Sequence, residues 1–226
     1  LFLTNSVEPN IMLLVDDSGS MDWEDLLNQG TTSPGDAILS SSTIYNPPGP
    51  YTDWWDRTLR RLFCNGFNVM AYNPNINYVP WSGHDNSNSP YPDMSITAAR
   101  TNPNDPSSTV DISNHYYWVW NDADGDGEYD GPGSTDSGAA ASASDECGDV
   151  SSNAGGVAVS SLSTAEQTNY ANWYTYYRKR EFVAKGAFGS VVANANNVRM
   201  GLATLHNNNT VNTAITSMNQ DYASGN

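Results

Sequence analysis

The chain has 226 residues, of which 25 are acidic and nine are basic, so its formal net charge at pH 7 is −16. An excess of negative charge of this size argues against binding to nucleic acid or to an anionic membrane surface, because both require cationic patches. Hydrophobic residues form 38% of the chain and no apolar run approaches the roughly 20 residues of a membrane-spanning helix, but seven Trp and thirteen Tyr supply large apolar areas for a core.

The first predicted element is a strand at residues 10–15. Its sequence, Asn-Ile-Met-Leu-Leu-Val, is a short continuous apolar run, which is typical of a strand that is buried on both faces. Residues 16–20, Asp-Asp-Ser-Gly-Ser, follow directly and predict a polar turn at the carboxyl end of this strand. Because open α/β sheets bind ligands outside the carboxyl ends of their strands, the turn is a candidate site.

Residues 23–162 are interrupted by many turns rich in Pro, Gly and Asn, and they predict no long helix. About 140 residues of structureless loop would not fit a compact domain, so we expect a subdomain with short strands. The best strand candidate is Tyr-Tyr-Trp-Val-Trp at residues 116–120. Between Arg100 and Arg178 there are twelve acidic residues and no Lys or Arg, which separates this region in character from the rest of the chain.

A helix is predicted from Ser163 to about residue 194, because Ser163 and Glu166 have the spacing of a capping box and no Pro follows in this stretch. We expect its four cationic residues, at positions 178, 179, 180 and 185, to be exposed to solvent. Its apolar residues recur in a pattern that favours packing on a sheet. These are Tyr170, Trp173, Tyr174, Tyr177, Phe188, Val191 and Val192. A second strand is predicted at residues 198–205, and the order strand, helix, strand indicates the α/β class.

Three residues of the first turn are candidate ligands of Mg²⁺. The spacing of Asp16, Ser18 and Ser20 presents alternate oxygen-bearing side chains toward one point, and Mg²⁺ prefers oxygen ligands in octahedral geometry. The two hydroxyls could bind directly, with the Asp16 carboxylate close by or reached through water. An ion with so few protein charges would remain electrophilic enough to capture a carboxylate from a partner. The alternative interpretation is an ordinary polar turn that caps a following helix.

Enzyme classes that could use the same turn are not favoured. A phosphotransferase with two aspartates two positions apart would need an aspartate where Ser18 stands. An aspartic protease would need a second aspartate at the end of an apolar strand, but Asp136 follows Gly-Pro-Gly-Ser-Thr. The histidines at 84, 115 and 206 lie far apart, and no Ser has the setting of a nucleophile elbow. We therefore expect a protein that is not an enzyme.

A second candidate cation site begins at residue 122. Asp122, Asp124 and Asp126 occupy positions 1, 3 and 5 of a calcium-binding loop, and Gly127 at position 6 permits its sharp turn. Three aspartates within five residues repel one another in the absence of a cation, so Ca²⁺ is the expected ligand. The alternative is an acidic turn that is solvated by water alone.

The remaining positions of this loop carry only some of the residues that a calcium-binding loop requires. Glu128 would contribute its backbone carbonyl, and Asp130 falls on position 9. Position 12 is Gly133 instead of a bidentate glutamate, so either Asp136 or a residue from elsewhere must complete the shell.

Cys64 and Cys147 are the two cysteines of the chain. They lie too far apart in sequence for a metal-binding pair. With this composition they favour one disulfide made in an oxidising compartment, and the alternative is two unrelated buried thiols.

Several of these stretches resemble known families. Residues 9–21, Pro-Asn-Ile-Met-Leu-Leu-Val-Asp-Asp-Ser-Gly-Ser-Met, resemble the first metal-binding loop of von Willebrand factor A domains, and residues 201–204 resemble their second strand. Four stretches resemble the PilC/PilY family of type IV pilus tip adhesins and biogenesis factors, namely residues 70–74, 78–81, 172–180 and 184–185. In that family a long insertion follows the first loop and the Asn-Trp-Tyr helix resumes the A domain, and the order is the same here.

The resemblance implies a Rossmann-like von Willebrand factor A half-domain, formed by residues 1–22 and 163–226. An acidic, loop-rich insertion with short strands, residues 23–162, would interrupt it. Asp16, Ser18 and Ser20 would belong to a metal-ion-dependent adhesion site, which a Thr and an Asp from two later loops complete in A domains. No convincing match to either later loop occurs before Asn226, so the missing C-terminal half of the protein is an expected partner.

The function implied by the resemblance is adhesion and surface sensing at the tip of a type IV pilus, outside the cell, after removal of a signal peptide. The expected partners are minor pilins or a host or surface ligand. The expected cofactors are Ca²⁺ and, as a second candidate, Mg²⁺. The competing hypothesis is a structural component of an extracellular filament or surface layer, in which the metal site is vestigial.

Overall fold

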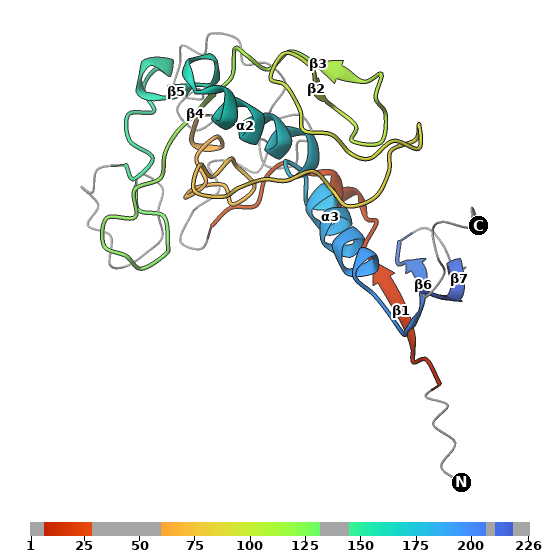
Figure 1. The fold of residues 1–226 in the computed structure, drawn as a ribbon. Coiled ribbons are helices and arrows are strands. Elements are labelled where there is room, and N and C mark those ends of the chain that lie inside the picture. Colours follow the sequence, from red (N-terminus) through yellow and green to blue (C-terminus); the bar gives the residue numbers. More distant parts are fainter. Residues whose placement is uncertain (1–6, 29–59, 132–144, 207–210, 219–226) are drawn as a thin grey trace.

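The computed structural model describes residues 7–28, 60–131, 145–206 and 211–218. They form two parts (Figure 1). The sheet part contains helix α3 (Arg180–Ala193) and three strands, and the loop-rich part surrounds helix α2 (Thr164–Tyr176). No helix among the described residues is both long enough and apolar enough to cross a membrane.

The sheet part contains strands β1 (Asn10–Val15), β6 (Arg199–Thr204) and β7 (Val211–Ser217) in the order β1-β6-β7. Strand β1 runs parallel to β6, with Val15 opposite Thr204, and β7 runs antiparallel to β6. Both predicted strands are thus confirmed, while β7 has no counterpart among the predicted elements. The parallel pairing places the carboxyl ends of β1 and β6 side by side, which is where the first candidate site begins.

Strand β1 is less buried than its apolar sequence predicts. Leu13 lines the space between the sheet and α3, together with Phe188 and Val192. Met12 and Leu14 point to the opposite face, as alternation along a strand requires, and they are 38% and 59% exposed. The prediction that β1 is buried on both faces is therefore wrong within the described part of the chain. In that part β1 is an outer strand of the sheet, and only one face of the strand is covered.

The helix predicted over residues 163–194 is two helices. Its capping box is confirmed, since the Ser163 hydroxyl accepts from the Glu166 N–H and the Glu166 carboxylate accepts from the Ser163 N–H. The chain leaves helical geometry at Tyr177 and is extended at Lys179, where φ is −110° and ψ is 148°. At this break the Arg180 N–H donates to the Trp23 carbonyl instead of bonding within the helix. A contact distant in sequence therefore ends α2 and starts α3.

Helix α2 packs into the loop-rich part and not onto the sheet. Tyr170 and Trp173 are buried, and both rings make tilted or edge contacts with Tyr72. The Trp173 indole N–H donates to the Met70 carbonyl at 3.0 Å. Packing on a sheet, as the periodicity predicts, is wrong for this aromatic face of α2, because the loops supply hydrogen-bond acceptors for the polar tips of such rings. The same prediction is confirmed for Phe188 and Val192 of α3, which line the space between that helix and the sheet.

The loop-rich part has short strands, as expected for this region. Strand β2 (Ala99–Arg100) pairs with β3 (Thr109–Val110), and β4 (Tyr116–Tyr117) pairs with β5 (Val157–Ala158), all antiparallel. The strand predicted at 116–120 is therefore confirmed for its first two residues. Among the residues that the structure describes there are also three short 3₁₀ turns, namely η1 (Gly19–Asp22) after β1, η2 (Asn153–Gly155) and η3 (Val159–Ser161). Cys64 and Cys147 form a disulfide, which confirms that prediction.

The cations at the break between α2 and α3 are not solvated as predicted. Arg178 is 4% exposed and pairs with Glu24 at 2.9 Å. Lys179 pairs with Asp22 at 2.5 Å, and the Arg180 guanidinium donates to the Asp25 carbonyl at 2.8 Å. These contacts of residues 178–180 with residues 22–25 are called the clasp below. Periodicity within a helix carries no information about such a partner some 155 residues away in sequence.

His115 lies in the core beside α2 and predicts a pH dependence of stability. The ring is 1% exposed, with Nδ1 at 3.2 Å from the Tyr170 hydroxyl. Burial, and then the charge of Arg178, lower the pKa of His115 to about 4. Between pH 6.5 and pH 4 the unfolded chain therefore binds more protons at His115 than the folded chain does. The contribution of the buried neutral His115 to the free energy of unfolding is lost as the pH falls through that window.

We expect a His115→Phe variant to report this effect. The difference in unfolding free energy between wild type and variant, from urea titrations, should shift by about 2 kcal/mol in favour of the variant between pH 7 and pH 5. The comparison with the variant is needed because burial also raises the pKa of Asp25 to about 6, which acts in the opposite direction in both proteins. A difference that stays constant with pH would contradict the prediction.

Candidate metal sites

The first candidate site is the turn at the carboxyl end of β1. The Asp16 carboxylate accepts the Ser18 N–H at 2.8 Å, and the hydroxyl oxygens of Ser18 and Ser20 lie 3.1 Å apart. All three predicted ligand residues thus lie on one tight turn that leads into η1. Two hydroxyls at this separation can approach one cation, and the donor set is the all-oxygen set that Mg²⁺ prefers.

Asp17 ties this turn to the neighbouring strand, a role that the sequence analysis missed. Its carboxylate accepts the His206 N–H at 2.6 Å. This bond, together with the Thr204 hydroxyl, lowers the pKa of Asp17, so the carboxylate stays charged. The Leu205 N–H also donates to the Val15 carbonyl. The ends of β1 and β6 are therefore held together immediately beside the candidate ligands.

A cavity of about 400 Å³ lies under the turn, between α3 and the carboxyl ends of the two parallel strands. Asp16 and Asp17 line it together with apolar side chains, among them Val15 and Phe188. Cavities of this volume at the carboxyl ends of parallel strands are common ligand positions in α/β proteins.

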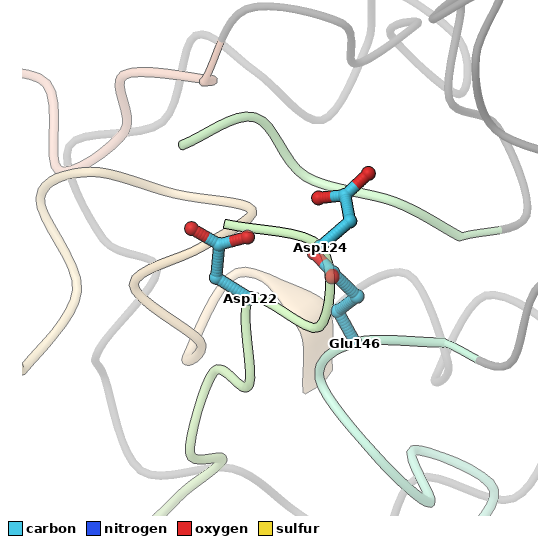
Figure 2. A group of neighbouring side chains, drawn as sticks. All are labelled: Asp122, Asp124 and Glu146. Carbon is cyan, nitrogen blue, oxygen red and sulfur yellow. The ribbon is translucent and has the colours of Figure 1, made fainter. Parts of the chain in front are cut away.

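The second candidate site is built from two separate segments of the loop-rich part. Asp122, Asp124 and Glu146 each place a carboxylate oxygen within 4.8 Å of the others (Figure 2). The two aspartates come from the predicted loop, and Glu146 comes from the segment that follows residue 144. Gly125 and Gly127 have φ of +80° and +81°, which L residues rarely adopt and which the sharp turn of the loop requires.

Glu146 is a carboxylate distant in sequence that lies beside the predicted loop. It is 7% exposed, and its carboxylate accepts the Ala123 N–H at 2.7 Å, the Trp120 indole N–H at 2.9 Å and the Asp130 N–H at 3.0 Å. No local spacing connects Glu146 with the loop, so sequence reasoning could not single it out. Its neighbour Cys147, in the disulfide, was the only signal that this segment returns to the core.

The other predicted ligands of this loop have different positions. The Asp126 carboxylate accepts the Glu128 N–H at 2.8 Å, and neither residue belongs to the group of three carboxylates. Asp130 is buried but also lies outside that group. Asp136 lies outside the described residues. The structure thus brings two of the five predicted residues to one point and adds Glu146.

Asp145 fixes the segment that carries Glu146. Its carboxylate pairs with Arg61 at 2.7 Å and accepts the Tyr129 hydroxyl at 2.7 Å and the Cys147 N–H at 3.1 Å. Burial, and then the bond to Asp145, raise the pKa of Tyr129, so the phenol remains a donor. Three contacts therefore position the segment that carries Glu146.

Residues 22–28 run from the first site to the second. They begin at the clasp, then pair with residues 67–69 through the bonds Asn28 N–H to Phe67 and Val69 N–H to Leu26. The Asn28 side chain donates to the Gly127 carbonyl at 3.2 Å, inside the acidic loop. A single short segment therefore contacts both candidate sites.

Comparison with known proteins gives one clear relationship. The chain is 30% identical over 200 residues to the type IV pilus biogenesis factor PilY1 of Pseudomonas aeruginosa (strain UCBPP-PA14). The chain is related to this pilus protein. The aligned region covers 83% of the chain and 15% of PilY1, so the chain spans only a small part of the length of its relative. No family model and no solved structure matches the chain, and the von Willebrand factor A fold therefore stays a prediction.

Proposed function

We propose that the chain is part of a type IV pilus adhesin or biogenesis protein that acts outside the cell, at the pilus tip, and binds a partner without enzymatic activity. The observation that carries this proposal is the 30% identity to PilY1 over most of the chain. The disulfide between Cys64 and Cys147 fits an oxidising, extracellular setting. The expected partners are minor pilins or a host or surface ligand, together with the rest of the protein itself.

The proposed binding site is the turn at the end of β1. Asp16, Ser18 and Ser20 would hold Mg²⁺, which would offer an open coordination position to a carboxylate of the partner. Asp17 keeps the turn against the end of β6 and so orients the two hydroxyls. The ligands that A domains supply from later loops would come from outside the described residues.

The proposed role of the second site is structural. Asp122, Asp124 and Glu146 would hold Ca²⁺ and thereby connect the acidic loop to the segment beside Cys147. Three carboxylates around one ion fit the hard oxygen ligands of calcium, and the loop curvature is already present.

The proposal is tested in cells that carry the full-length protein. We expect Ser18→Ala with Ser20→Ala to leave pili at normal number but to abolish attachment, while Ser107→Ala, an exposed serine outside both sites, changes neither. Unchanged attachment in the double variant would favour the competing structural role with a vestigial metal site. Crosslinking that recovers no pilus component with the native protein would contradict the pilus assignment.

The calcium site predicts a thermal shift. With a dissociation constant in the 10⁻⁴–10⁻³ M range of extracellular modules, about 10 mM Ca²⁺ added after EDTA treatment should raise the melting temperature by roughly 3–10 °C. Glu146→Gln should remove most of this rise, because the amide is a poorer calcium ligand than the carboxylate. Asp111→Asn, an exposed acid outside the loop, should keep it. An equal rise in the Glu146 variant would exclude Glu146 as a ligand.

A further inference from the structure

A groove of about 580 Å³ lies along the first half of α2, away from both cation sites. Thr164 and Thr168 of the helix form one wall, and Asn77, Tyr78 and Asp93 of two loops form the other. It shares no lining residue with the cavity under the first turn or with the carboxylate group of the second site. The groove is therefore a separate candidate site.

Two asparagines of α2 hold the loop wall in place. The Asn169 side chain accepts the Tyr78 N–H at 2.7 Å and donates to the Ile76 carbonyl at 2.8 Å. The Asn172 side chain, which is 2% exposed, donates to the Tyr78 carbonyl at 3.0 Å and to the Asp93 carboxylate at 2.8 Å. The groove is therefore formed before any ligand arrives, which lowers the entropic cost of binding.

Several polar groups that face the groove are uncommitted. Among the described residues, the side chains of Asn77, Thr164 and Thr168 make no hydrogen bond. Asp93 uses one carboxylate oxygen for Asn172 and presents the other as an acceptor. Two hydroxyls, one amide and one carboxylate offer donors and acceptors together.

The charge of the lining restricts the ligand class. Asp93 is the charged residue of the groove and no Lys or Arg lines it, which disfavours an anion even though the first turn of α2 borders the groove. A single carboxylate does not form a metal site, and the lining offers too few large apolar side chains for a lipid or an apolar peptide. We propose that the groove binds an uncharged polyhydroxylated ligand, such as a saccharide unit, whose hydroxyl groups pair with Asn77, Asp93, Thr164 and Thr168.

The test is isothermal titration calorimetry, in which saccharides are added to the chain in the presence of EDTA and the heat of binding is measured. The probes are uncharged disaccharides built from glucose, galactose or N-acetylglucosamine, each beside its uronic acid counterpart. We expect saturable binding of at least one uncharged probe and at least tenfold weaker binding of its uronic acid. Thr168→Val, which keeps the shape of the side chain, should weaken binding about fivefold to tenfold, because a ligand hydroxyl loses its partner.

Two further variants sharpen the result. Thr109→Val makes the same chemical change on an exposed strand outside the groove and should leave binding unchanged. Asp93→Asn should reduce the discrimination against the uronic acid, because the repelling charge is gone. The proposal is overturned if no uncharged probe binds, if the two threonine variants behave alike, or if uronic acids bind more tightly to the wild type. Because EDTA is present throughout, any binding that is observed does not pass through the proposed cation sites, and circular dichroism of the same samples checks that the chain stays folded without them.

Discussion

Replacing Cys64 and Cys147 together by alanine should lower the free energy of unfolding by about 4–5 kcal/mol. The bridge joins residues 83 positions apart, and in the chain-entropy model a loop of this length restricts the unfolded state strongly. Both sulfurs are almost completely buried, so alanine is a better replacement than serine, which would bury an unpaired hydroxyl. Denaturant titration followed by tryptophan fluorescence measures the loss.

Single variants provide the control for the disulfide. Cys64→Ala alone should cost nearly as much as the double change, because either substitution breaks the bridge. Reductant added to the wild type should produce a similar loss and should have no effect on the double variant. A double variant within about 1 kcal/mol of the wild type would show that the bridge adds little to stability.

Arg178→Met should cost about 3–5 kcal/mol of unfolding free energy. The substitution leaves the Glu24 carboxylate, which is 3% exposed, without the guanidinium that pairs with it. The guanidinium also donates to the Tyr174 and Thr101 carbonyls, both at 2.7 Å, so these acceptors lose a partner as well. Denaturant titration at pH 7 measures the effect.

A double-mutant cycle separates the buried charge from the lost packing. Adding Glu24→Gln to Arg178→Met should recover part of the loss, since no uncompensated charge then remains in the core. Lys185→Met provides the matched control, because Lys185 pairs with Glu181 on the exposed surface of α3 and should cost less than about 0.5 kcal/mol. Equal losses for Arg178→Met and Lys185→Met would show that the clasp contributes no more than a surface pair.

The parts of the fold that depend on local sequence were predictable. A continuous apolar run specified β1, and the Ser163 and Glu166 spacing specified the start of α2. The disulfide followed from the number of cysteines and the composition of the chain. Each of these signals lies within a few residues or in the overall composition, so none of them depends on knowing which distant residues come into contact.

The features that were missed all depend on contacts distant in sequence. The break between α2 and α3 follows from the Trp23 carbonyl, and the burial of Arg178 follows from Glu24. Glu146 lies beside Asp122 and Asp124 in a segment whose next residue, Cys147, is bonded to Cys64. Local spacing predicted that an acidic loop would form, but it could not identify which distant carboxylate would meet it.

The clasp also determines how the loop-rich part is attached. The chain leaves the sheet part near Asp22 and returns near Lys179, and the ion pair between these residues places the two crossings side by side. A segment whose ends lie this close can be exchanged as a unit, because a short linker can close the gap that its removal leaves. We therefore expect that a short linker between Asp22 and Lys179 can replace the segment between them without opening the sheet part.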